Sequence, residues 1–217
     1  MDFVFEQIRV GGDRNFGYLF GDRSSRVAAA IDPSFAPELV LERAKDQGLE
    51  IELILNTHGH PDHANGNDAM KRLTGAPIAA HPASPNDYDL PLEDGESIDV
   101  GEFSLQVLHV PGHTPDHVLF YCPQTKVALT GDHLFVGKIG GTATEAEARA
   151  EFDSLRHMLR TLPDDTTIWP GHDYGCRPSS TIGIEKATNP FLLVDDFDAF
   201  LDLKRTWATF KASNGLK

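Results

Sequence analysis

Four short apolar runs in this sequence each lead into histidine or aspartate. The first run covers residues 51–55 and precedes residues 57–63, which read THGHPDH. The other three cover residues 103–110, 126–130 and 166–169, and they lead into PGH at 111–113, GD at 131–132 and PGH at 170–172. Short runs bounded by Gly and Pro are typical of buried strands. Since open sheets build their sites beyond the carboxyl ends of strands, the pattern favours a fold in which four strand ends meet.

Segment 57–63 is the densest of the four. It holds His58, His60, Asp62 and His63, with no cysteine among them. Nitrogen and oxygen donors of this kind suit borderline divalent metals such as Zn, Mn or Fe. Alternate residues of an extended segment project to the same side, so His58 and His60 are predicted to hold one ion together. Asp62 and His63 follow a proline that bends the chain, so they are predicted to face a neighbouring position.

A cluster of this kind needs partners from elsewhere in the chain, and the other strand ends supply them. They contribute His113, Asp132 and His172. Together the four strand ends deliver five histidines and two aspartates, which is enough for two metal ions. The alternative for segment 57–63 is a polar loop with surface histidines.

The motifs resemble those of the metallo-β-lactamase superfold, and within it the hydroxyacylglutathione hydrolases (glyoxalase II) of the compact bacterial type. The resemblance runs from about Phe16 to Leu193 and includes GDHLF at 131–135. It implies an α/β fold, an αββα sandwich that forms a single domain over residues 1–193. Residues 194–217 would then be a C-terminal helical extension.

The resemblance also implies a ligand set. The first metal would be held by His58, His60 and His113. The second metal would be held by Asp62, His63 and His172, with Asp132 bridging the two ions.

The chemistry follows from two divalent ions about 3.5–4 Å apart, which share a water and lower its pKa from about 15.7 to near 7. The bridging hydroxide then attacks a carbonyl carbon while one ion polarises the carbonyl oxygen. A thiolate leaves readily because the pKa of a thiol is about 8.5, so a thioester is the least demanding substrate. We therefore predict a metal-dependent thioesterase of the hydroxyacylglutathione kind, with Asp62 and Asp132 as catalytic carboxylates. We expect two divalent ions, Zn foremost, with Fe or Mn as alternatives.

Two departures from the family pattern concern the substrate. Gly141 stands where these hydrolases and the related persulfide dioxygenases place a basic residue that meets glutathione or its persulfide. Lys138 lies three positions earlier. Asp116 replaces a glycine, and its carboxylate beside the site is expected to disfavour anionic substrates. The sequence thus leaves the recognition of glutathione open.

Three alternative functions remain open at this point. The first is a persulfide dioxygenase with one iron held by His58, His113 and Asp132. The second is another hydrolase of the superfold that opens lactones or β-lactams. The third is a binding module that holds metal without turnover.

Composition restricts the partners. The chain has 19 Lys and Arg against 33 Asp and Glu, a net charge of −14 that would repel a phosphate backbone, so no nucleic-acid partner is expected. The first residues lack a basic region and a long apolar core, which argues against a secretory signal. No apolar stretch approaches the roughly 18 residues of a membrane span. Two cysteines suggest reduced thiols, and the predicted location is the cytoplasm.

Periodicity and turn residues predict alternating strands and helices. Strands are expected at 4–10, 15–20, 27–31 and 77–80, and helices at 37–47, 66–73 and 145–162, while residues 81–95 are expected to form a loop. Residues 195–211 predict an amphipathic helix that packs against the domain or a second subunit of a homodimer. His117 and His133 are expected to support the ligands from behind, and His157 to lie in solvent.

Overall fold

The computed structural model describes residues 2–213, which form two six-stranded sheets and a two-stranded hairpin. The first sheet consists, in spatial order, of β1 (Phe3–Gly11), β2 (Asn15–Asp22), β3 (Val27–Ile31), β4 (Glu50–Leu55), β5 (Ile78–Ala80) and β6 (Leu90–Pro91). The second consists of β14 (Ser180–Thr181), β13 (Thr167–Pro170), β10 (Val127–Gly131), β9 (Val118–Cys122), β8 (Phe103–His109) and β7 (Ser97–Val100). The hairpin pairs β11 (Leu134–Phe135) with β12 (Lys138–Ile139).

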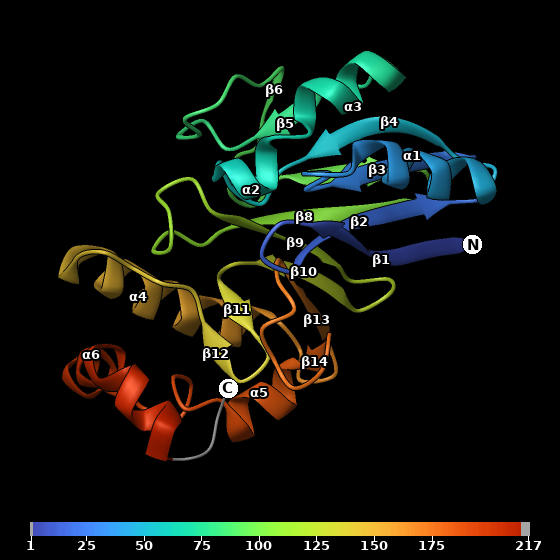
Figure 1. The fold of residues 1–217 in the computed structure, drawn as a ribbon. Coiled ribbons are helices and arrows are strands. Elements are labelled where there is room, and N and C mark those ends of the chain that lie inside the picture. Colours follow the sequence, from blue (N-terminus) through green and yellow to red (C-terminus); the bar gives the residue numbers. More distant parts are fainter. Residues whose placement is uncertain (1, 214–217) are drawn as a thin grey trace.

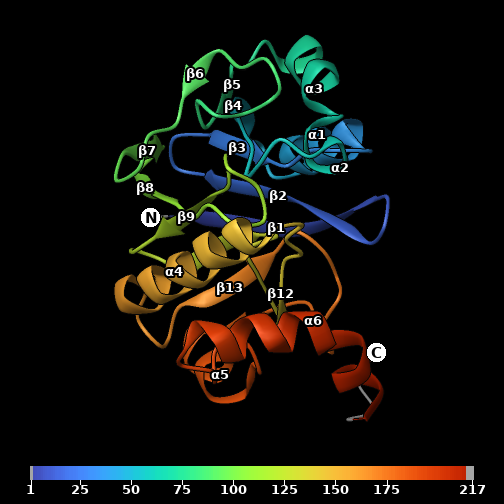
Figure 2. The ribbon, with the colours of Figure 1, turned by 90° about the vertical axis from the view of Figure 1, so that its left-hand side faces the viewer.

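Helices cover the outer face of each sheet (Figure 1). The helices α1 (Pro37–Asp46), α2 (Pro61–Ala64) and α3 (Asn67–Thr74) lie over the first sheet. The helices α4 (Glu145–Thr161), α5 (Ile182–Thr188) and α6 (Phe197–Ser213) lie beyond the second sheet, as the turned view in Figure 2 also shows. The predicted αββα sandwich is therefore confirmed.

Three apolar clusters hold the four layers together. The cluster between the sheets includes Phe20, Phe103 and Phe120, whose side chains are almost completely buried. A second cluster lies between the first sheet and its helices, and a third lies between the second sheet, α4 and α6. Since each buried aromatic side chain removes about 150–250 Å² of surface from water, the central cluster fixes how the sheets face one another.

The strand directions explain where a site forms. Strands β8 and β9 are antiparallel, as are β9 and β10, whereas β10 and β13 are parallel. The carboxyl ends of β8, β10 and β13 therefore meet at one edge of the second sheet. The segment after β4 reaches the same edge, where the N–H of Val118 donates to the carbonyl oxygen of Thr57 at 2.8 Å. The predicted meeting of four strand ends is thus observed.

Most predicted elements are present with boundaries shifted by one or two residues. Strand β3 spans the predicted residues 27–31, and the strand predicted at 77–80 is β5. The expected loop at 81–95 was wrong in part, because its residues 90–91 form β6 beside β5. Two short helices were not predicted. Helix α2 begins at Pro61, whose fixed φ suits the first turn of a helix, and α5 begins after Thr181, whose side chain accepts from the N–H of Ile184.

The predicted C-terminal helix is α6, and it packs on the body of the domain. Phe197 and Phe200 belong to the same apolar cluster as Phe152 of α4. Residues 214–217 of the predicted extension lie outside the described residues. Helix α4 begins with a capping box in which Thr144 and Glu147 bond reciprocally. Among residues 2–213, none of the helices has both the length and the apolar character needed to cross a bilayer.

Candidate metal centre

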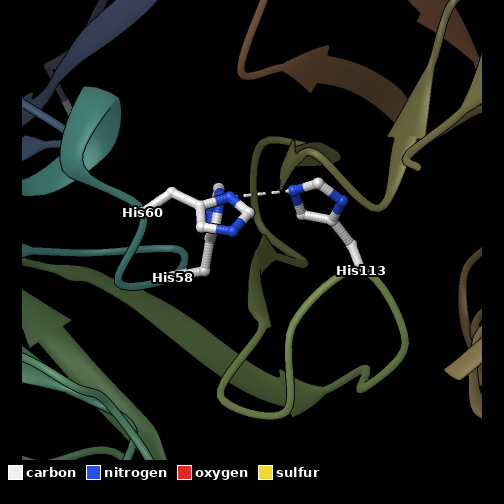
Figure 3. A group of neighbouring side chains, drawn as sticks. All are labelled: His58, His60 and His113. Carbon is white, nitrogen blue, oxygen red and sulfur yellow. Dashed lines mark hydrogen bonds between the residues drawn. The ribbon is translucent and has the colours of Figure 1, made fainter. Parts of the chain in front are cut away.

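Three histidines from two loops form what we call the first donor group. His58 and His60 follow β4, and His113 follows β8. Nε2 of His58 lies 3.0 Å from Nδ1 of His60, and Nε2 of His113 lies 3.1 Å from the same Nδ1. Figure 3 shows the three rings turned toward one another, with His113 reaching across from its own loop. The predicted pairing of His58 with His60 is present in the geometry.

The second donor group combines a carboxylate with two imidazoles. Nε2 of His63 lies 3.2 Å from Nε2 of His172. Oδ2 of Asp62 lies 3.4 Å from the His172 nitrogen and 3.9 Å from the His63 nitrogen. In each donor group the ligand atoms all lie within 4.8 Å of one another.

Asp132, directly after β10, lies between the two groups. Its Oδ1 is 3.4 Å from Nε2 of His63, and its Oδ2 is 3.3 Å from His172 and 3.6 Å from Nε2 of His113. The structure thus brings together all seven residues predicted as ligands. Gly131, with a φ of 49°, makes the turn that aims this carboxylate, and a Cβ at that position would lie 2.7 Å from Oγ1 of Thr57.

These seven residues fit a pair of divalent cations. Imidazole nitrogens about 3 Å apart cannot both present lone pairs to each other without a proton or a cation between them. Oδ1 of Asp132 is buried and has no hydrogen-bond partner among the described residues. An orphaned carboxylate oxygen surrounded by converging nitrogens is the arrangement that a bound cation stabilises.

The ionisation of the first donor group and of Asp132 favours cation binding. Burial lowers the pKa of His58 well below its usual value, and burial with the nearby His113 lowers the pKa of His60. Both rings therefore keep their lone pairs free at neutral pH. Burial alone would raise the pKa of Asp132, but the charge of His63 and the hydrogen bonds from His172 and His63 together outweigh burial, and the pKa lies well below its usual value. Asp132 is therefore a carboxylate.

Asp32 supports the second donor group and was not predicted. Its carboxylate lies 3.0 Å from Nδ1 of His63 and accepts hydrogen bonds from the backbone N–H and the hydroxyl of Thr57 at 2.8 and 2.7 Å. With Nδ1 engaged, Nε2 of His63 faces Asp132 and His172. The sequence carried a signal, because Asp32 follows β3 directly and precedes Pro33, as the ligands follow the other strands.

Backbone carbonyls orient two other ring ligands. Nδ1 of His113 donates to the carbonyl oxygen of Gly141 at 2.7 Å, and Nδ1 of His172 donates to that of Asp13 at 2.9 Å. A neutral ring that donates through Nδ1 keeps its lone pair on Nε2, so both rings offer Nε2 to the centre. The ring of Tyr174 stacks on His172 with centroids 4.5 Å apart.

Two residues between His113 and β9, Asp116 and His117, accept hydrogen bonds from the backbone of the ligand loops. His117 accepts the backbone N–H of Asp132 through Nε2 at 3.0 Å and stacks on His58, in agreement with its expected supporting position. The expectation that Asp116 disfavours anionic substrates stays a prediction. The carboxylate of Asp116 is buried and accepts the N–H of Gly59 at 2.7 Å, so it holds the ligand loop.

The other histidines and the cysteines lie outside the donor groups. His81 and His109 stack on each other with centroids 4.0 Å apart, and His157 is exposed as expected. Cys122 is buried and Cys176 is exposed, and neither is in a disulfide.

A cavity of about 480 Å³ is lined in part by Gly141, whose carbonyl oxygen accepts from His113 of the first donor group. Residues 138–145 and α6 line it, and Lys204 donates from Nζ to the carbonyl oxygen of Gly140 at 3.0 Å. A Cβ at Gly141 would meet nothing within 4 Å, so this position has room for a side chain. Lys138 also lines the cavity, and its Nζ lies 4.1 Å from the centre of the Tyr174 ring.

Known proteins share both the sequence pattern and the fold. The family model described as the metallo-beta-lactamase superfamily matches residues 28–172. The mitochondrial persulfide dioxygenase ETHE1 of Homo sapiens is 38% identical over 186 residues, which cover 82% of this chain and 71% of that protein. The hydroxyacylglutathione hydrolase of Thermosynechococcus vestitus is 34% identical over 215 residues, which cover 82% and 84%. The crystal structure of ETHE1 from Myxococcus xanthus has a TM-score of 0.85 and 30% identity, covering 94% of this chain and 91% of that one.

Proposed function

Because the chain belongs to the metallo-beta-lactamase superfamily, we propose that it is a metal-dependent hydrolase that cleaves thioesters of the hydroxyacylglutathione kind. The observation that carries this proposal is the second donor group. Asp62, His63 and His172 converge beside Asp132 as closely as the three histidines of the first group do. One iron held by His58, His113 and Asp132 would not require this second group.

The seven donors would hold two divalent ions, and Zn is the ion we propose. Such ions supply an activated water and polarise the carbonyl of the substrate. Asp132 is the carboxylate within reach of both groups, and we assign its Oδ2 to hold the proton that the attacking water loses. Asp62 is the second proton acceptor, since its side chain is 40% exposed and Asn15 donates to its Oδ2 at 3.0 Å. The thiolate leaves without a dedicated acid, because the pKa of a thiol is about 8.5.

The cavity beside His113 supports a substrate with an acidic thiol part. Its volume of about 480 Å³ lies within the roughly 300–1,000 Å³ of small-molecule pockets. Lys138, Lys204 and Arg205 line it together with one carboxylate, Glu145, which pairs with Arg205 at 3.2 Å, so the wall has a net positive charge on a chain with a net charge of −14. A tripeptide thiol such as glutathione carries carboxylates that this wall would attract.

The proposal extends to the setting of the enzyme. We propose a cytoplasmic protein that acts on a small molecule, with neither nucleic acid nor membrane as a partner, and that forms a homodimer. Size measurement in solution and cell fractionation test these points independently of catalysis.

The test of the proposed activity is direct. Purified protein is expected to release free thiol from S-lactoylglutathione, with chelation abolishing the release and Zn restoring it. Metal analysis of the same preparation is expected to find two ions per chain. Protein loaded with two ions that leaves a panel of thioesters untouched would contradict the proposal, and turnover of lactones or β-lactams in the same panel would reassign the substrate.

A second candidate is a persulfide dioxygenase with one iron. It is favoured by the 38% identity to the human enzyme and by the close fit to the Myxococcus xanthus structure. It predicts one bound iron per chain, oxygen consumption with glutathione persulfide, and sulfite as the product.

A further inference from the structure

A buried acidic residue of α4 lies directly behind the first donor group. The side chain of Glu151 is fully buried. Its Oε2 accepts the backbone N–H of His113 at 2.8 Å. Its Oε1 lies 3.0 Å from Nδ1 of His133, whose side chain is also fully buried, and neither of these two atoms makes a hydrogen bond among the described residues. One carboxylate therefore contacts two residues from separate loops.

The loop that carries His113 is shaped to receive this carboxylate. Gly112 has a φ of 151°, and a Cβ there would lie 2.3 Å from Oε2 of Glu151 and 2.4 Å from its Cα. Only glycine allows that approach. One turn further along α4, the hydroxyl of Ser154 donates to the carbonyl oxygen of Pro111 at 2.8 Å. Helix α4 thus holds the loop at two points next to His113.

The other contact of Glu151 reaches the loop that carries Asp132. His133 is the next residue in the chain, and its N–H donates to the carbonyl oxygen of Thr130 at 3.1 Å. The Glu151 carboxylate therefore joins the backbone of one donor residue to the neighbour of another. These two donors, His113 and Asp132, face each other with Nε2 and Oδ2 at 3.6 Å.

Packing alone does not account for a carboxylate at this position. The residues of α4 buried around it include Ala148, Phe152, Leu155 and Met158, which form part of an apolar cluster. A buried charge is costly unless it is paired, and an apolar side chain of similar size is often as stable or more stable there. The carboxylate of Glu151 at this buried position therefore points to a role in the adjoining metal centre.

We propose that Glu151 and His133 form a positioning pair that sets the separation of His113 and Asp132 and so strengthens cation binding by the first donor group. The inference rests on the metal centre of the proposed function, but not on the thioester as substrate. The pair does not touch the reacting atoms. It acts through the two donors that it holds.

Cobalt binding to metal-free protein tests the pair. Titration of the His172→Ala variant, which lacks part of the second group, isolates the first group, and titration of His60→Ala isolates the second. In the first background, Glu151→Ala is expected to raise the cobalt dissociation constant about 10–100-fold, the usual effect of removing a group that orients ligands. In the second background the change is expected to stay below about threefold.

Conservative variants separate positioning from packing. Glu151→Gln keeps an oxygen for the His113 N–H but loses the charge beside His133, so it is expected to recover much of the affinity that Glu151→Ala loses. The double variant Glu151→Ala with His133→Ala is expected to lose less affinity than the two single losses combined, because the pair acts as a unit. Glu147→Ala is the matched control: it weakens the start of the same helix and should leave both dissociation constants unchanged.

Each outcome decides the proposal. Variants at Glu151 that lower only the unfolding temperature, with first-group affinity unchanged, would overturn it. If Glu151→Ala does not fold, His133→Gln decides, and wild-type first-group affinity in that variant would equally overturn the proposal. A wild-type chain that binds no cobalt would overturn the metal centre itself, whereas normal cobalt binding without thioester turnover would contradict only the proposed substrate.

Discussion

The two donor groups share Asp132 but differ in charge and in exposure. The first consists of three imidazoles, two of which have pKa values lowered by burial. The second contains Asp62, whose side chain is 40% exposed, and with Asp132 it presents two carboxylates to a divalent ion. Imidazole suits Zn and Fe, whereas carboxylate also suits harder ions such as Mn. The comparison teaches that one centre offers two unlike environments, so its two positions should not be equivalent in affinity or in role.

The largest effect is expected at Asp132, the residue that both donor groups share. Asp132→Ala removes the only carboxylate of the centre that lies within 3.6 Å of donors from both groups. We expect thioester turnover to fall at least about 1,000-fold, the upper end for removal of one electrostatic group from an active site, and both ions to be lost. Initial rates and metal content measure this, with the exposed Asp165→Ala as a control. Two retained ions and a wild-type rate would refute the bridging position.

The next largest effect shows which of the two donor groups is needed for catalysis. In a two-metal hydrolase, His60→Ala and His172→Ala are each expected to lower thioester turnover about 100-fold, because each removes one ligand atom from one group. In a dioxygenase with iron on His58, His113 and Asp132, neither substitution removes an iron ligand, so both variants would keep persulfide oxidation largely intact. Parallel assays of both variants on a thioester and on glutathione persulfide separate the two functions.

A smaller effect concerns the orientation of one ring in the second group. In Asp32→Asn the new amide N–H₂ group can face Nδ1 of His63. The proton of the ring is then forced onto Nε2 and no longer lies between the ring and residue 32. We expect cobalt affinity of the second group to fall about 10–100-fold, with little change in the first group.

Asp22→Asn is the matched control for that substitution. Asp22 is also fully buried and accepts backbone N–H groups, from Ser24 at 2.9 Å and Glu102 at 3.0 Å, but it touches no donor. Its replacement should cost about 1–3 kcal/mol of stability without changing metal affinity. If both substitutions changed stability alone, Asp32 would have no orienting role.

The smallest effect is expected from a substitution in the wall of the cavity next to the first donor group. Gly141→Lys places a cation where a Cβ meets no neighbour, so the fold should accept it. We expect KM for a glutathione thioester to fall about tenfold with kcat unchanged, which corresponds to about 1.4 kcal/mol from one charge-assisted contact. Gly141→Gln controls for size. An unchanged KM in both variants would indicate that the thiol part of the substrate lies elsewhere.

Sequence reasoning succeeded where the information was local. All seven donors lie in the segments that follow β4, β8, β10 and β13, so their types and positions could be read from short motifs, and the structure brings them together. Asp32 and Glu151 were missed because their roles depend on contacts across the fold. Glu151 is one of several acidic residues in an amphipathic helix, and nothing in the sequence indicates that its side chain contacts His113 and His133.

The shortest elements were missed for a related reason. Helix α2 and strands β11 and β12 have four or fewer residues, too few to show a period. Pairing with distant residues, as between β5 and β6, fixes such segments, and that information lies outside any short window of sequence.

The wall of the cavity beside His113 is built from residues 138–145 and α6, and none of these is a metal donor. If this cavity holds the substrate as proposed, the residues that set the reaction type and those that set the substrate preference belong to different segments of the chain. A lineage could exchange the hairpin or the last helix and acquire a new acyl or thiol partner while the ligand loops stay untouched. Grafting these two segments between relatives is accordingly a route to redirecting the catalyst.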